Sequence, residues 1–558
     1  MTAACPINVG AATFGGMKGT TQYSPIESAD APIRFTDVSV GAPGASLLMQ
    51  PCSGVLWPRE LLGVMGPSGA GKTLLVKAWA GQAHGLRTDG GFTLDGKSLD
   101  ENWFRSNVVF VPTEPILNPT LSVEATCQYY AGLTGHEYVD VADRLERFQM
   151  TGVRSVLAGA LSSGQQKRLS VMNALWMNPR MLVLDEPTSG LSDADALAVM
   201  ELLRDLSASR TVVCVLHQPR TRIFKAFDRL ALVRNGALIA LNATDSILNS
   251  LGSSCPAEES VAAFLMDVVS DRNFDVPSFQ AALKNHEPSA QRKTEAFYGR
   301  PRTPSWWERF LICCATDVRA GINNRGYVVG HLAINAFVLA SYGVVFATPT
   351  EDPLGAIFQF NACLFFFLVG IYFLFTSFKM EELEIERRQF KQDHFNRLVT
   401  PLMYFVSSCA SDTIYTLLAT PILTPTFLYF LRLPLDALQP VVRTALLMWL
   451  TLTVALLYRK LAFALIATPN TRFILQRNLD VVILGFNGVF VPRQDIPSGL
   501  QWICFLNPFY YIIQALFDTW GVEYNRDEVV TFPLAIACLF VILGVFVLIS
   551  TARLHWIY

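Results

Sequence analysis

The chain has 558 residues, 51% of them hydrophobic and 16% charged, and its formal net charge is −2. This length predicts at least two domains, and the lack of a basic excess argues against a nucleic-acid-binding protein. The eleven cysteines are scattered among apolar neighbours, without a Cys-x-x-Cys pair or a Cys/His metal-ligand spacing. We therefore expect buried thiols in a reducing compartment, with neither a disulfide framework nor a zinc site.

The composition changes along the chain and predicts four segments. Residues 1–31 are rich in Gly, Ala, Ser and Thr and lack a long apolar core, which favours a flexible tail over a signal peptide. Residues 32–271 have the mixed charge and short apolar runs of a soluble α/β domain, and the polar residues 272–304 predict a linker. In residues 305–558 long apolar stretches dominate, several of them near the about 20 residues that span a bilayer.

The first chemical motif is a glycine-rich loop that follows the short apolar run Leu61–Met65. A helix pattern comes directly after it, so the motif has the strand, loop and helix context of a phosphate-binding P-loop. Its glycines allow successive backbone N–H groups to point towards phosphate. We expect Lys72 to meet the β- and γ-phosphates of ATP and Thr73 to place its hydroxyl on Mg²⁺. The predicted nucleotide-binding residues of the loop are Gly66, Pro67, Ser68, Gly69, Ala70, Gly71, Lys72 and Thr73.

Two later buried-strand patterns end in polar residues. Met181–Leu184 is followed by Asp185 and Glu186, and Val212–Leu216 is followed by His217. A carboxylate at a strand end beside a P-loop suits Mg²⁺, so Asp185 is the predicted metal ligand. Glu186 is the predicted catalytic residue that orients or deprotonates the attacking water, and His217 is predicted to sense the γ-phosphate. The alternatives are an acidic helix cap for the two carboxylates and a structural role for His217.

These segments resemble the nucleotide-binding domain of ATP-binding cassette (ABC) transporters. The segment Leu161-Ser-Ser-Gly-Gln-Gln-Lys-Arg168 resembles the signature motif of that family. The resemblance implies that two cassettes sandwich ATP head to tail, with Ser162, Gly164 and Gln165 binding the nucleotide held by the other subunit's P-loop. Because the chain contains one P-loop and one signature, the resemblance implies a dimer with ATP and Mg²⁺ as cofactors.

Several positions depart from the family pattern. Thr113 stands where the family usually has Gln, and the neighbouring Glu114 is a candidate substitute. Ser163 replaces a usual glycine of the signature, Ser192 replaces a usual Asp, and no aromatic residue for adenine stacking lies near Val40. The departures leave two functions open, an ATP-hydrolysing transporter subunit and a hydrolysis-deficient regulatory or scaffold subunit.

The order of cassette before membrane domain resembles the G subfamily of these transporters (the White and breast-cancer-resistance-protein type). Pro256–Asp271, Ile496–Pro497 and Asn507–Tyr511 resemble further segments of that subfamily. The resemblance implies a half-transporter that pairs as a homodimer or heterodimer. It also implies export of lipid, sterol, pigment or xenobiotic-like substrates across the plasma membrane or an internal membrane.

Residues 305–558 predict an all-α polytopic domain with six spanning helices, of the ABC-2 type that the resemblance implies. Before the first span, Trp306–Asn323 has an amphipathic pattern that predicts a helix at the membrane surface, or alternatively one packed on the cassette. The predicted spans are Tyr327–Ala347, Leu354–Phe378, Tyr404–Leu431, Val441–Ala467, Leu479–Val491 and Phe532–Ala552. The fifth is short, and we expect it to form a span plus a re-entrant element with Ile496–Trp520.

Charges in the predicted loops suggest the orientation. Basic residues gather in two loops on one side of the spans, whereas Thr348–Pro353 has none: Arg387, Arg388, Lys391 and Arg397 in one loop, Arg472 and Arg477 in the other. By the positive-inside rule the cassette and both termini are predicted to be cytoplasmic.

The charged segment Glu384–Phe395 resembles the coupling helix of the family. Its matching positions are Glu386, Arg387, Phe390 and Asp393, with Asp393 standing where the family usually has Glu. The resemblance implies that it transmits cassette closure to the spans. The alternative is a solvated charged loop that only determines topology.

Three charges fall in the apolar stretches: Arg459 and Lys460 interrupt the fourth, and Asp480 begins the fifth. Charges inside a bilayer are costly and normally pair or line a wet path. One hypothesis is a polar cluster that lines a cavity and selects substrate. The other is that the spans end here and the side chains reach the membrane interface.

Overall fold

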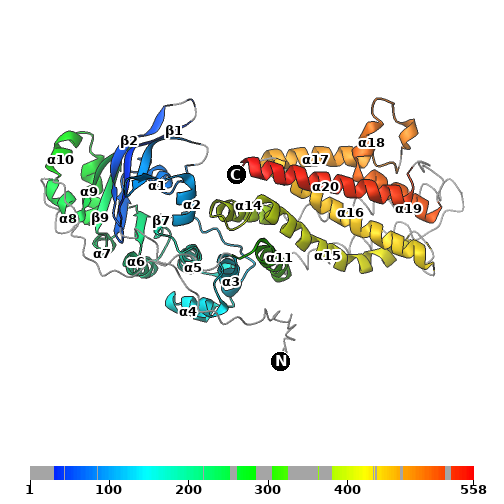
Figure 1. The fold of residues 1–558 in the computed structure, drawn as a ribbon, viewed down its shortest axis with the longest axis horizontal. Helices are drawn as coiled ribbons and strands as arrows, with labels where there is room; N and C mark the ends of the chain where they lie inside the picture. The colour runs from blue at the N-terminus through cyan, green and yellow to red at the C-terminus, as the bar shows by residue number, and fades with distance from the viewer. Residues whose placement is uncertain are drawn as a thin grey trace.

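The computed structural model describes residues 31–557, except for 43, 45, 84–85, 218, 252–259, 284–303, 325–361, 363–379, 431–432, 434–436, 466–468, 490 and 522–529. Nearly all of the predicted tail, most of the predicted linker and nearly all of the first two predicted spans lie outside the described residues. We call the part of the chain before residue 284 the cassette and the part from α11 (Trp306–Asn323) onwards the membrane half. Figure 1 shows the two parts side by side.

A six-stranded sheet with the order β10-β9-β3-β8-β7-β6 forms the centre of the cassette. The strands are β3 (Leu61–Met65), β6 (Val108–Val111), β7 (Met181–Asp185), β8 (Thr211–Val215), β9 (Arg229–Arg234) and β10 (Ala237–Ala243). β6, β7, β8, β3 and β9 pair in parallel, and β10 pairs antiparallel with β9. Strands buried on both faces appear in sequence as continuous apolar runs, which is why β3, β7 and β8 were recognisable.

A second, antiparallel sheet has the order β2-β1-β4-β5. Its strands are β1 (Ile33–Gly41), β2 (Leu47–Leu56), β4 (Arg87–Leu94) and β5 (Lys97–Ser98). Helix α1 (Lys72–Trp79) shares one buried cluster with residues of both sheets. In that cluster the rings of Phe35 and Trp79 lie 5.3 Å apart. The two sheets therefore hold α1, and the glycine-rich loop that precedes it, in place.

Helices complete the cassette. They are α2 (Glu101–Asn107), α3 (Val123–Thr134), α4 (Tyr138–Arg147), α5 (Ser163–Leu175), α6 (Asp193–Ser207), α7 (Thr221–Phe224), α8 (Thr244–Ser250), α9 (Val261–Ser270) and α10 (Val276–Ala282). Local sequence explains the ends of α3: the Ser122 hydroxyl accepts a hydrogen bond from Ala125 N at 3.2 Å, and Gly135 follows with φ 81°. The polar segment after residue 271 carries α10, whose Gln280 Nε2 donates to Ile239 O of β10 at 3.2 Å.

The described membrane half is helical. Its helices are α11, α14 (Met380–Phe395), α15 (Pro401–Phe430), α16 (Leu438–Leu465), α17 (Pro469–Gly485), α18 (Trp502–Leu506), α19 (Pro508–Trp520) and α20 (Phe532–Ile557). Within the described residues two stretches are long and apolar enough to cross a membrane, Leu438–Leu461 and Phe532–Leu554. The count of six spans stays a prediction.

The expected fifth span differs from the observed helix. α17 begins at Pro469 and ends at Gly485, whereas Leu479–Val491 was expected. The chain then leaves the helix, and Gly488 adopts φ 82°, a backbone conformation that a helix does not contain.

Helix α11 has the predicted bounds and bridges the two parts of the molecule (Figure 1). Ser305 and Glu308 form a capping box at its start. On the cassette side Arg319 Nη1 donates to Gln128 Oε1 of α3 at 2.8 Å. On the other side the Ser411 hydroxyl of α15 donates to Cys314 O at 3.3 Å. The predicted surface helix is therefore packed on the cassette and on α15 at once.

The charges inside α16 are buried and joined to α15. Lys460 Nζ lies 2.7 Å from Asp412 Oδ2 and donates to the Ser408 hydroxyl at 2.6 Å. Arg459, which is 1% exposed, has Nη2 3.8 Å from the same carboxylate. The helix α16 continues to Leu465, but its stretch that is apolar enough to cross a membrane ends at Leu461, beside Lys460, so the end of the span here stays a prediction. The cavity beside Asp412 and Lys460 measures about 10 Å³, which leaves no room for a substrate in this conformation.

Replacing Asp412 with Asn tests this buried pair. The change leaves two cations buried without their carboxylate, which costs about 3–5 kcal/mol when a buried pair is broken. We expect a lower melting temperature of the purified protein in lipid nanodiscs, measured by tryptophan fluorescence. The control is Asp495→Asn, at an exposed carboxylate of a short 3-10 helix. Equal melting temperatures for both variants would contradict the assignment.

Candidate functional site

The glycine-rich loop between β3 and α1 requires glycine at three positions. A Cβ on Gly66 would lie 2.1 Å from the carbonyl oxygen of Val233 in β9, which is closer than any real contact. Gly69 and Gly71 have φ 75° and 100°, values that residues with a side chain rarely adopt. The loop can therefore pass close beneath β9 and still lead directly into α1.

Lys72 is held inside this loop. Its ammonium donates to Gly66 O and Pro67 O, both at 2.9 Å, and the residue is 7% exposed. Burial lowers the pKa of Lys72, and the neighbouring carboxylates of Glu186 and Asp185 act in the opposite direction. The ammonium is thus positioned at the loop whose backbone N–H groups can cradle phosphate.

Thr73 and Asp185 supply two neighbouring oxygen atoms of the kind that Mg²⁺ prefers. The Thr73 hydroxyl donates to Asp185 Oδ1 at 3.2 Å, from the start of α1 to the end of β7. Burial raises the pKa of Asp185, and hydrogen bonds from Thr73 and Thr113 act against this rise. These groups fit a divalent cation, and Thr73 and Asp185 would hold it.

Thr113, at the usual glutamine position, lies near enough to Asp185 to act against the rise in the pKa of that carboxyl group. Glu114, the candidate substitute, has a side chain that is 86% exposed, and its Oε2 lies 3.4 Å from Arg388 Nη1 of α14. The expectation that Glu114 takes the role of the missing glutamine is not supported, because its carboxylate is engaged with the membrane half.

A cavity of about 870 Å³ brings the predicted chemistry together. The loop from Ser68 to Thr73 lines it, together with Glu186 and His217 from the ends of two parallel strands. The turn after Asp185 leads to α6, which starts at Asp193, so the two carboxylates do not cap a helix. The roles of Glu186 and His217 stay predictions, but the structure does bring both residues to the P-loop.

Sequence reasoning missed Lys167. From α5 its ammonium donates to the carbonyl oxygens of Thr113 and Glu186, the latter at 3.3 Å. Glu186 has φ 49°, so its backbone is in a conformation that needs support from its surroundings. A lysine near the start of a helix is an ordinary sequence feature, and only the tertiary fold shows that it ties two segments beside the cavity.

The predicted signature residues lie outside this cavity in the single chain. Ser162 caps α5: its hydroxyl accepts from Gln165 N at 3.3 Å, and Gln165 Oε1 accepts from Ser162 N at 3.0 Å. A Cβ on Gly164 would lie 2.9 Å from the Asp195 carboxyl group, so glycine is needed here for α5 to approach α6. Their predicted contact with a partner subunit's nucleotide stays a prediction.

The other two departures have structural roles. Ser163 is exposed, and its hydroxyl donates to Gly190 O at 3.4 Å. Ser192 caps α6, because its hydroxyl accepts from Asp195 N at 3.2 Å and donates to Asp195 Oδ2 at 2.7 Å. Neither serine enters the P-loop cavity of its own chain.

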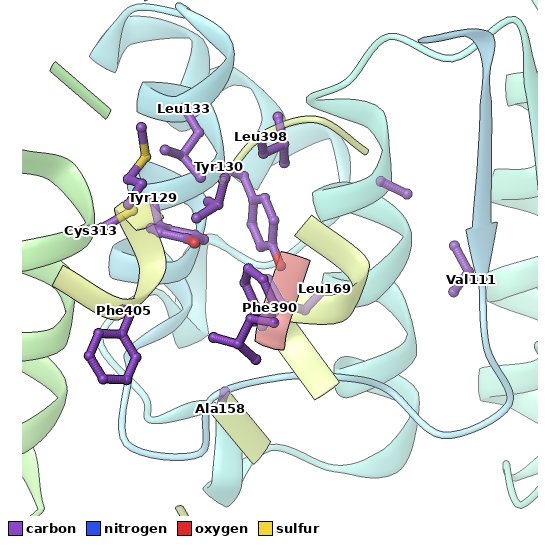
Figure 2. Packing of buried hydrophobic residues seen from close by; sticks show 14 of the residues in the cluster. Val111, Tyr129, Tyr130, Leu133, Ala158, Leu169, Cys313, Phe390, Leu398 and Phe405 are labelled. Atoms are coloured by element: carbon purple, nitrogen blue, oxygen red, sulfur yellow. The ribbon is translucent and has the colours of Figure 1, made fainter. Parts of the chain in front are cut away.

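Helix α14 packs its charged segment into the cassette. Asp393 is 1% exposed, and the Tyr129 hydroxyl of α3 donates to its Oδ2 at 2.9 Å. Figure 2 shows Tyr129 and Tyr130 of α3, Cys313 of α11 and Phe390 of α14 in one buried cluster. The segment is thus a docked helix, and the alternative of a solvated loop is wrong. We call this contact of α3, α11 and α14 the transmission joint.

Asp393 predicts a pH dependence of the joint. Burial raises the pKa of Asp393 from 3.8 to about 7, against hydrogen bonds from Tyr129, Tyr130 and Gln389. Because the folded protein holds this proton more tightly than the unfolded chain, the associated stability is fully present below about pH 4 and is lost as the pH rises through about 7.

We therefore expect the wild-type melting temperature to fall more between about pH 5 and pH 8 than that of Asp393→Asn, which has no proton to lose. Tryptophan fluorescence of the protein in nanodiscs measures both profiles. Asp267→Asn, at an exposed position of α9, should follow the wild type. Parallel profiles for the wild type and Asp393→Asn would show that this carboxyl group does not govern the joint.

Comparison with known proteins agrees with this arrangement. Residues 49–189 match the family described as ABC transporter, and residues 308–519 match the family described as ABC-2 type transporter. ABC transporter G family member 8 of Dictyostelium discoideum is 26% identical over 487 residues, which cover 82% of this chain and 76% of that protein.

Two further relatives have the same kind of name. ABC transporter G family member 12 of Dictyostelium discoideum is 25% identical over 523 residues, covering 88% of this chain and 81% of that protein. ABC transporter G family member 22 of Arabidopsis thaliana is 32% identical over 276 residues, covering 47% of this chain and 36% of that protein. With its nucleotide-binding cassette before an ABC-2 membrane domain, the chain belongs to the ABC transporters and has the arrangement of a G-family half-transporter.

Proposed function

We propose that the chain is one half of an ATP-driven transporter and hydrolyses ATP when it dimerises. One observation carries this proposal: Lys72, the adjacent pair Asp185 and Glu186, and His217 come from three separate segments of the sequence and meet at the glycine-rich loop. P-loop ATPases use this set of groups to hold phosphates, bind a metal and direct water.

Each residue has a task in the proposed reaction. Lys72 moves from the carbonyl groups of its own loop to the β- and γ-phosphates. Thr73 and Asp185 would hold Mg²⁺, which would offset the negative charge of the phosphates. Glu186 orients the attacking water and accepts its proton, and His217 hydrogen-bonds the γ-phosphate from the end of β8. Lys167 supports the backbone of Glu186 in this position.

The proposal includes a dimer with two shared ATP sites. The start of α5 presents Ser162 and Gln165, which are not buried, outside the P-loop cavity of the same chain. A helix N-terminus favours an anion, so a second subunit that places its own nucleotide there would complete the site. Either a second copy of this chain or another half-transporter can supply that subunit.

The second candidate function is a hydrolysis-deficient regulatory or scaffold subunit. The observation that favours it is the short side chain of Thr113, which cannot extend into the cavity as a glutamine does. Against it, Thr113 lies beside the predicted metal ligand Asp185, and Ser163 and Ser192 leave the P-loop cavity unobstructed. These contacts favour the hydrolysing subunit.

The transported molecules that we propose are lipid, sterol, pigment or xenobiotic-like, and the direction is export. The apolar surface of α20 supports a membrane setting: Leu534, Phe540, Val541 and Leu548 are all exposed in the single chain. We place the cassette and both termini in the cytoplasm, on the charges of the predicted loops. The membrane would be the plasma membrane or an internal one.

ATP hydrolysis by the purified chain in lipid nanodiscs tests the function. Removing the carboxylate in Glu186→Gln should lower kcat by about 10²–10⁴-fold, the range of a lost general base, with ATP binding retained. Glu201→Gln, at an exposed carboxylate of α6, serves as the control and should hydrolyse ATP like the wild type. If folded, dimeric wild-type protein shows no more activity than Glu186→Gln, the regulatory subunit becomes the better account.

A further inference from the structure

The cavity at the glycine-rich loop continues beyond the predicted phosphate position. It follows α1 past Lys77 to Gln82 and Leu86, and its opposite wall is formed by α14. A helix rises about 1.5 Å per residue, so Lys77 lies about 7.5 Å further along α1 than Lys72. The residues that α14 contributes are Arg388, Lys391, Gln392, His394 and Phe395. The far end of the cavity thus lies between the cassette and the membrane half.

This far end is strongly basic. Lys77 comes from α1, and Arg388 and Lys391 come from α14, whereas Glu186 is the one carboxylate among the described residues that line the whole cavity. Cations that share the walls of a cleft attract anions over a distance, because the low-dielectric walls focus the field. Lys72 belongs to the predicted ATP phosphates, whereas Lys77, Arg388 and Lys391 lie along the rest of the cavity.

Two of these basic groups, Lys77 and Lys391, lie close enough for the charge of one to act on the other. The pKa of Lys391 is lowered by burial and then by the positive charges of Arg387 and Lys77. Arg388 meets Glu114 at 3.4 Å, but that carboxylate is on the exposed side and does not line the cavity. An anion between α1 and α14 would relieve this repulsion.

We propose that Lys77, Arg388 and Lys391 form a second anion-binding subsite, separate from the P-loop, that takes a phosphate group. We call it the distal subsite. It rests on the proposed function only in that the neighbouring P-loop holds ATP. The phosphate comes either from a soluble phosphate compound or from the headgroup of an anionic phospholipid, and both share the chemistry that the three cations recognise.

Occupation of the distal subsite would tie the nucleotide site to the transmission joint. Lys77 lies on the helix that starts at the P-loop, and Arg388 and Lys391 lie on the helix that carries Asp393. A phosphate held between them crosslinks α1 to α14 through charge-assisted hydrogen bonds. The anion would therefore favour one arrangement of cassette and membrane half and regulate transport without touching the γ-phosphate.

The experiment uses the full chain with Glu186→Gln, saturated with MgATP so that the P-loop is filled. One arm titrates inorganic phosphate into protein in phosphatidylcholine nanodiscs, and the other compares nanodiscs with and without phosphatidylglycerol. Melting temperature is the readout, because a ligand that binds only the folded protein stabilises it. We expect one arm to raise the melting temperature, and that arm identifies the source of the phosphate.

The double variant Arg388→Gln/Lys391→Gln should raise the phosphate or lipid concentration needed for the same rise in melting temperature by about tenfold or more. This is the loss of affinity expected when hydrogen bonds to charged groups are removed. The matched control, Arg319→Gln/Arg397→Gln, removes equal charge at positions that hydrogen-bond to the cassette but do not line the cavity. An unchanged response in the first pair, or no response in either arm, would overturn the proposal.

One further variant separates this proposal from the proposed function. Lys72→Ala should lose ATP binding, measured with radiolabelled ATP, and keep the response to the anion. A protein that responds to the anion but never hydrolyses ATP would support the distal subsite and contradict the hydrolysing half-transporter. A protein that hydrolyses ATP but shows no anion response would support the hydrolysing half-transporter and contradict the distal subsite.

Discussion

The buried contact between Tyr129 and Asp393 is the constraint on which the two parts of the molecule depend. A carboxyl group removed from water needs hydrogen-bond donors, and the cassette supplies the Tyr129 hydroxyl from α3. The hydrophobic residues around it, Phe390 of α14 and Cys313 of α11, bury the remaining surface. The geometry of the joint is therefore specific, since sliding α14 along α3 would strand a buried polar group.

Nucleotide chemistry and mechanical coupling meet in the same small region. Thr113 lies beside the predicted metal ligand Asp185, and the next residue, Glu114, reaches α14. Lys167 adds a link from α5 to this loop and to Glu186. The predicted phosphate site is therefore connected to α14 of the membrane half through one or two side-chain contacts, which suits a family in which ATP drives movement of the membrane domain.

Much of this could be predicted from sequence, because the relevant signals are local. The P-loop, the strands that carry Asp185 and His217, and the bounds of α11 follow from short patterns of glycine, apolar residues and caps. What could not be predicted depends on contacts distant in sequence, such as Lys167 with Thr113, and Lys460 with Asp412. The end of α17 was missed because helix ends in apolar sequence have weak signals. The structural roles of Ser163 and Ser192 could not be predicted, because the hydrogen bond of Ser163 to Gly190 and the cap that Ser192 forms on α6 are recognised only from their geometry.

α15 contains Pro421 and Pro425 within its length. Each proline lacks the backbone N–H that an α-helix uses, so consecutive turns lose a hydrogen bond at this level. Nearer the start of α15, the salt bridge from Asp412 to Lys460 joins α15 to α16. Five residues, 396–400, connect α14 to α15. The part of α15 before Pro421 is therefore expected to move as one piece, and the two prolines are where the helix would bend. A tilt of α14 would then bend α15 at these prolines.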